Sequence, residues 1–127
     1  ADEQAVTADN TAAMIDGHPV KEIQDAMKEY ISHQSGPSGA FEIYDSVTSQ
    51  LRRAKLIGIH DSVGKTRNNY YSCADFKDID NNQNLDLDID VRYMGGRPNV
   101  TGVMIHKVKD KERYTYDQDG NRIPESP

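Results

Sequence analysis

Residues 84–93, NLDLDIDVRY, alternate apolar and charged side chains at every position after the first. The apolar members of this run are Leu85, Leu87, Ile89, Val91 and Tyr93, and the charged ones are Asp86, Asp88, Asp90 and Arg92. A spacing of two places all five apolar side chains on one face of a pleated strand, whereas a helix would scatter them around its circumference. The run predicts a half-buried β-strand that needs a cover for its apolar face and neighbours for its edges.

An amphipathic helix after Pro19 can supply that cover. Its apolar side chains recur at helical spacing and form one stripe: Val20, Ile23, Met27, Tyr30 and Ile31. Proline suits the first helical position because its missing N–H would have no partner there, and Gly36 and Pro37 end the helix. One apolar stripe beside one apolar sheet face predicts a two-layer α+β domain.

The remaining strands are expected at residues 51–63, 69–80, 100–109 and 112–117, with a short first strand near Phe41 to Asp45. A second helix from Phe41 to Leu51 stays open as an alternative for that first segment. Short loops favour antiparallel pairing. The predicted fold is therefore α+β, with one N-terminal amphipathic helix packed on a curved antiparallel meander of five to six strands.

Turn positions give this meander an expected register. We expect Val91 to pair with Val103 and Ile89 with Ile105, after a loop at residues 94–99 in which Pro98 stops the ladder. A turn centred on Asp110 and Lys111 would then set Ile105 opposite Tyr116. The same register puts His106 on the acidic face opposite Asp88.

The turn at residues 64–69 is expected to bring His60 opposite Cys73. The register of residues 70–80, and with it the face that Cys73 occupies, stays open.

Three segments make up the expected domain organisation. Residues 1–17 are predicted to be a flexible lead-in with a helical turn near residues 11–15, residues 18–117 a single domain, and residues 118–127 a flexible tail. The small and acidic opening, ADEQAVTADN, is typical of a mature terminus after signal-peptidase cleavage. We therefore expect an exported protein, periplasmic or secreted, of bacterial origin.

Charge and composition exclude some classes of partner. The net charge of −6 disfavours nucleic acid, and no apolar run reaches the length of a membrane span, so no membrane insertion is expected. Cys73 is the single cysteine, which excludes an internal disulfide.

Two sets of side chains are candidate metal ligands. Asp78, Asp80 and Asp86 surround the loop at residues 80–84 and could hold a calcium ion, although Gln83 and Ile89 replace the glycine and glutamate of an EF-hand loop. If no ion binds there, the acidic residues around this loop and strand are expected to form a solvated strand face. His60 and Cys73, with His106 if the sheet brings it near, form a set suited to zinc. The sequence does not require a cofactor. If one of these two sets does bind an ion, calcium or zinc is expected. No catalytic residue is assigned.

One helix followed by an antiparallel meander, over residues 18–117, is similar in element order to cystatin-like and ketosteroid-isomerase-like domains. The resemblance is topological, and it implies a cone between helix and sheet without assigning functional residues. Residues 114–122, YTYDQDGNR, also resemble one copy of the tyrosine–aspartate repeat of bacterial toxin shells, which we interpret as shared hairpin chemistry.

Because no catalytic set is evident, the sequence favours a non-enzymatic exported binding or accessory domain. It would recognise a partner through a sheet face or edge, and a homodimer through such a surface stays open. The alternative is a small-molecule or divalent-cation site in a cone between helix and sheet, with catalysis left open.

Overall fold

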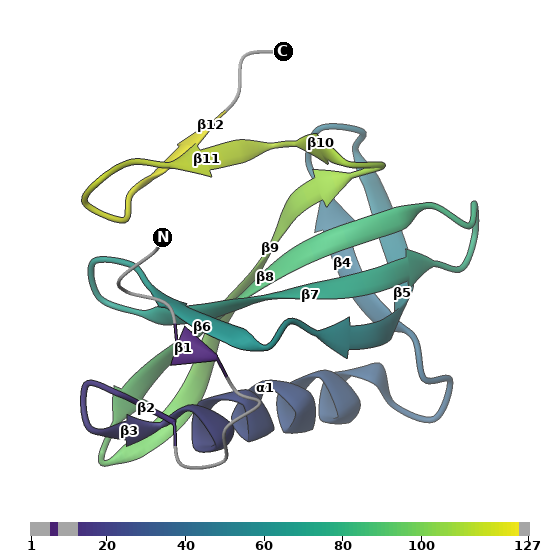
Figure 1. Ribbon diagram of the computed structural model, residues 1–127. Coiled ribbons are helices and arrows are strands. Elements are labelled where there is room, and N and C mark those ends of the chain that lie inside the picture. Colours follow the sequence, from purple (N-terminus) through teal and green to yellow (C-terminus); the bar gives the residue numbers. More distant parts are fainter. Residues whose placement is uncertain (1–5, 8–12, 125–127) are drawn as a thin grey trace.

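The computed structural model describes residues 6–7 and 13–124, and shows a curved antiparallel sheet with helix α1 on one side and the hairpin β11–β12 on the other (Figure 1). The elements are β1 Val6–Thr7, β2 Met14–Ile15, β3 His18–Pro19, α1 Val20–Ser35, β4 Phe41–Asp45, β5 Gln50–Ile59, β6 Ser62–Lys65, β7 Tyr70–Asp78, β8 Asn84–Met94, β9 Arg97–Val108, β10 Lys111–Glu112, β11 Tyr114–Tyr116 and β12 Arg122–Pro124. The predicted α+β class, with one helix on a curved antiparallel sheet, is confirmed.

The main sheet has the strand order β1-β6-β7-β8-β9-β10, and β5 continues it from β7 to β4. Among the described residues it therefore has eight strands, more than the five to six expected. The extra strands are short: β1 and β10 have two residues each, and β6 continues after β5 along the same edge of β7. No described helix is long and apolar enough to span a bilayer.

Helix α1 covers the apolar face of β8, as the sequence predicted. Its stripe is buried against the strand's alternating apolar residues in one core that contains Val20, Ile23, Met27, Ile31, Leu85, Leu87, Ile89 and Val91. The helix begins one residue later than expected: Pro19 is extended (ψ 127°) and pairs with Met14 in the β2–β3 hairpin. Gly36 ends the helix with a positive φ of 62°.

The segments around the helix differ in how well they were predicted. Residues 41–45 form strand β4, which confirms the strand and excludes the alternative helix. The helical turn expected near residues 11–15 was wrong at Met14 and Ile15, which form β2, and residues 11–12 lie outside the described part of the chain. Ile15 is buried in the core, so packing against the sheet fixes this strand.

The register between β8 and β9 differs from the expected one. Ile89 pairs with Val103 and Val91 with Val100, because the turn is limited to Gly95 and Gly96, with φ of 61° and 76°. Pro98 does not stop the ladder, since it lies on β9 opposite Tyr93. β9 has no other strand neighbour at this end among the described residues, and an edge strand is where a sheet tolerates proline.

The chain after β9 was predicted least well. The turn lies at Lys109 and Asp110, one residue earlier than expected, and Tyr116 pairs with Arg122 of β12 and not with Ile105. Residues 122–124, which lie within the expected tail at residues 118–127, form β12. The hairpin inferred for residues 114–122 is confirmed, since β11 pairs antiparallel with β12.

The helix–sheet contact predicts the effect of truncating its apolar stripe. Ile23 is fully buried, so Ile23→Ala should lower the free energy of unfolding by about 2–5 kcal/mol, measured by urea denaturation. Lys28→Ala on the exposed side of α1 is the control and should change it by less than about 0.5 kcal/mol. Equal effects of the two variants would contradict the helix orientation.

Candidate functional site

Asp88 lies at the centre of the sheet face that points away from α1, and its side chain is fully buried. Three donors surround its carboxylate. The Cys73 thiol donates to Oδ1 at 3.0 Å, and the hydroxyls of Tyr114 and Tyr116 donate to Oδ2 at 2.6 and 2.7 Å. The acidic face is therefore not the solvated surface that the sequence suggested, because the hairpin β11–β12 covers it.

Local hydrogen bonds determine how the hairpin forms. Asp117 Oδ1 accepts the backbone N–H groups of Asp119 and Asn121 at 2.8 and 2.9 Å, which closes the turn. Gly120 has a φ of 79°, and a Cβ atom there would lie 2.9 Å from Thr66 Cα. Glycine is thus needed both for the backbone angle and for the close approach of the hairpin tip to the turn after β6.

Side-chain contacts attach the hairpin to the sheet. The Arg122 guanidinium makes two hydrogen bonds to Asp90, of 2.6 and 2.5 Å, and its Nε donates to the Tyr116 hydroxyl at 2.9 Å. Tyr116 also stacks on Tyr71 of β7, with ring centroids 4.9 Å apart. A bidentate arginine–carboxylate pair with little solvent exposure is a strong and directional contact.

His106 of β9 is held by the same hairpin. Its ring stacks on Tyr114 at 4.7 Å, and Nε2 lies 3.1 Å from the Tyr114 carbonyl oxygen. A carbonyl only accepts, so Nε2 carries the hydrogen, and when the ring is neutral Nδ1 has a free lone pair. Nδ1 is buried without a hydrogen-bond partner and lies 3.6 Å from Asp88 Oδ1.

Asp86 is the second residue of this face with an unsatisfied buried atom. Its Oδ1 has no hydrogen-bond partner. Burial, together with the nearby charge of Asp88, raises the pKa of the Asp86 carboxyl above its ordinary value. Desolvation and the charge of Asp88 therefore outweigh the nearby basic side chains, which act on this pKa in the opposite direction.

Cys73 occupies the same face as Asp88, its register partner on β8. Burial, with the charge of Asp88, raises the pKa of the Cys73 thiol, so the group is protonated at neutral pH. A metal ion would have to displace this proton, since the thiolate is the ligand.

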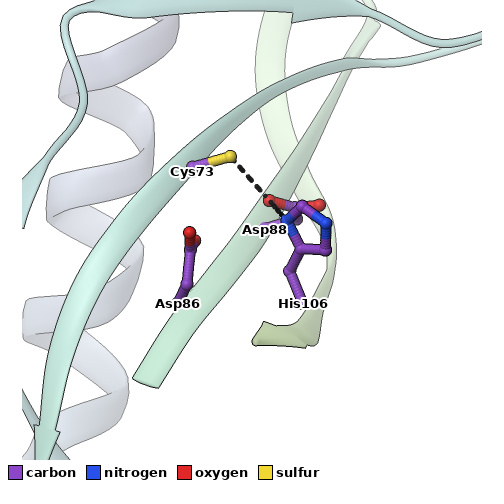
Figure 2. Close-up of side chains that lie close together, drawn as sticks. All are labelled: Cys73, Asp86, Asp88 and His106. Atoms are coloured by element: carbon purple, nitrogen blue, oxygen red, sulfur yellow. Dashed lines mark hydrogen bonds and ion pairs between the residues drawn. The ribbon is translucent and has the colours of Figure 1, made fainter. Parts of the chain in front are cut away.

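Cys73, Asp86, Asp88 and His106 therefore converge from three strands (Figure 2). One ligand atom from each lies within 4.8 Å of the others. Ligand atoms at zinc bond lengths of about 2.0–2.3 Å lie about 3.3–3.8 Å apart in a tetrahedron. The Cys73–Asp88 and Asp88–His106 separations of 3.0 and 3.6 Å are already close to this range.

The structure places the predicted ligand pair His60 and Cys73 side by side on the backbone, because the His60 N–H donates to the Cys73 carbonyl at 2.9 Å. Their side chains belong to different groups, however. The His60 ring lies 3.0 Å from Asp75 Oδ1 and, with Asp75 and Asp86, forms a second group of ligand atoms within 4.8 Å.

The other predicted set does not gather in one place. Asp78 is buried and binds Arg52 at 2.9 Å, and Asp80 binds Arg53 at 2.7 Å on the surface. Both carboxylates already have a guanidinium partner, and Asp86 belongs to the cluster beneath the hairpin.

Sequence reasoning missed Asp88 as a candidate ligand, and it missed Tyr114, Tyr116 and Arg122 as its surroundings. The available signal was the spacing of Tyr114 and Tyr116, which places both hydroxyls on one face of a strand. His106 was correctly placed on the acidic face, but Met104 and not His106 is the register partner of Asp88.

The chain was also compared with protein-family models, curated proteins and solved structures, and none of the three comparisons found a match.

Breaking the arginine contact should release the hairpin. Arg122→Ala leaves Asp90, which is 5% exposed, without its cation, and the expected cost is about 3 kcal/mol. Hydrogen exchange at the amides of β11 and β12 should accelerate strongly, while the amides of α1 stay protected.

Arg92→Ala, an exposed arginine two residues from Asp90, is the matched control and should leave exchange in the hairpin unchanged. Unchanged exchange in Arg122→Ala as well would contradict the role of this ion pair.

Proposed function

We propose that the protein is a non-enzymatic metal-binding domain that holds a zinc-class divalent ion between Cys73, Asp86, Asp88 and His106. The hairpin β11–β12 covers this site on the side away from the sheet. The proposal places the ion on the sheet face opposite α1, because the face toward the helix is filled by the apolar core.

One observation carries the proposal: His106 is oriented as a ligand. Metal-binding histidines usually donate their second ring N–H to a carbonyl or carboxylate, which fixes the tautomer and directs the free nitrogen to the metal. Here the Tyr114 carbonyl accepts from Nε2, and the buried Nδ1 is directed toward Asp88 without a hydrogen-bond donor. A cation at this position would satisfy Nδ1 and the unpartnered Asp86 Oδ1 together.

The donor atoms favour zinc over calcium. Sulfur, imidazole nitrogen and carboxylate oxygen are ordinary zinc ligands, whereas calcium takes six to eight oxygens. Four protein donors complete a tetrahedral shell without leaving a position for water, which is typical of structural and binding sites and not of catalytic ones. This supports a binding role for the ion held by these four residues.

Zinc should therefore stabilise the wild-type protein. At a free concentration of 100 times Kd, an ion that binds only the native state adds about 2.7 kcal/mol, which appears as a higher Tm in thermal denaturation. EDTA should reverse the shift. His106→Asn removes the Nδ1 ligand and should abolish most of the shift.

His33→Asn is the matched control, because His33 is exposed on α1 and distant in sequence from every proposed ligand. It should retain the full zinc-dependent shift. The same shift in His106→Asn as in the wild type would contradict the proposed site, and so would no shift in the wild type.

Export to the periplasm, and recognition of a protein partner through a sheet face or edge, stay predictions. Enrichment of one partner from a native periplasmic extract would support the recognition of a partner, and detection of the protein itself in that extract would support export.

A further inference from the structure

We propose that a second divalent ion binds beside the first, held by His60, Asp75 and Asp86, with Asp86 as a carboxylate bridge between the two ions. This inference rests on the proposed zinc site and extends it. The ion at the outer position would be of the zinc class, and it would have a coordination position open to water or an anion.

The first support is the position of Asp86 between two groups of ligand atoms. It belongs to the buried group with Cys73, Asp88 and His106, and to the outer group with His60 and Asp75. In each group the ligand atoms lie within 4.8 Å of one another. Two-metal sites hold their ions about 3.5–4 Å apart, a separation that one carboxylate with two oxygens can span.

The second support is the unsatisfied state of Asp86 itself. Its Oδ1 is buried and has no hydrogen-bond partner, although Asp86 shares one group of ligand atoms with His106 and the other with His60. A buried carboxylate oxygen without a donor is costly. The inner ion would satisfy Oδ1, which leaves the other carboxylate oxygen of Asp86 for the outer ion.

Charge balance also favours two ions. The two groups together contain three carboxylates, Asp75, Asp86 and Asp88, and one thiolate when Cys73 is deprotonated. One divalent ion would leave two of these four negative charges uncompensated by metal. Two divalent ions balance all four, which matters because Asp88 is fully buried.

The two positions differ in access to solvent. Side chains at the outer position are exposed, 42% for His60 and 55% for Asp75, whereas those of Asp88 and His106 are 0% and 12% exposed. The outer position offers three protein donors, one fewer than the inner. Three protein ligands plus water is the open arrangement, so the outer ion would exchange more readily and bind more weakly.

The test is a cobalt titration of the full chain, followed by absorption spectroscopy and calorimetry. The wild type should bind two ions. The tighter one produces thiolate-to-cobalt charge-transfer absorption through Cys73, and the weaker one does not. His60→Asn and Asp75→Asn change exposed side chains, so neither substitution should prevent folding. Each should weaken the binding of the second ion at least about tenfold. The charge-transfer step should stay unchanged in both.

Asp86→Asn should weaken both steps, because the bridge serves both ions, and His33→Asn should weaken neither. A wild-type stoichiometry of one, with the charge-transfer absorption present, would overturn the second ion and leave the proposed function intact. A second step that is insensitive to His60→Asn and Asp75→Asn would also overturn it, by placing that ion elsewhere. Absence of any cobalt binding would overturn the second ion and the proposed function together.

Discussion

The buried carboxylate of Asp88 is the constraint on which the outer side of this protein depends. A charge with no solvent exposure must find donors within the protein, and among the described residues of the sheet the Cys73 thiol donates to it. The two tyrosine hydroxyls of β11 supply the rest. The C-terminal hairpin therefore belongs to the fold as a third layer: it satisfies Asp88, and Arg122 compensates Asp90 beside it.

The same hairpin prepares the proposed metal ligands. The Tyr114 carbonyl fixes the His106 tautomer and the Tyr114 ring stacks on the imidazole, so closing the hairpin orients Nδ1 toward Asp88. An ion bound at Nδ1 and the Asp88 carboxylate would in turn hold together the groups that the hairpin covers. Metal affinity and hairpin closure are thus expected to be linked, because each stabilises the state that the other requires.

The sequence was sufficient for features that depend on local periodicity. The alternation at residues 84–93 and the apolar stripe of α1 predicted the two-layer core, because each pattern allows one buried face. The register was wrong because bulges in β9, and the two-residue turn at Gly95–Gly96, shift pairing without changing the pattern. Asp88 could not be recognised as buried, since its cover comes from Tyr114 and Tyr116, far along the chain. The resemblance to cystatin-like and ketosteroid-isomerase-like domains stays a prediction.

The most direct test of the metal centre is X-ray absorption at the zinc edge, on the wild-type protein loaded with one equivalent of zinc. We expect one sulfur neighbour at about 2.3 Å, from Cys73, and nitrogen or oxygen neighbours at about 2.0–2.2 Å. A first shell that contains only nitrogen and oxygen would show that zinc does not reach the cluster beneath the hairpin, and would contradict the account.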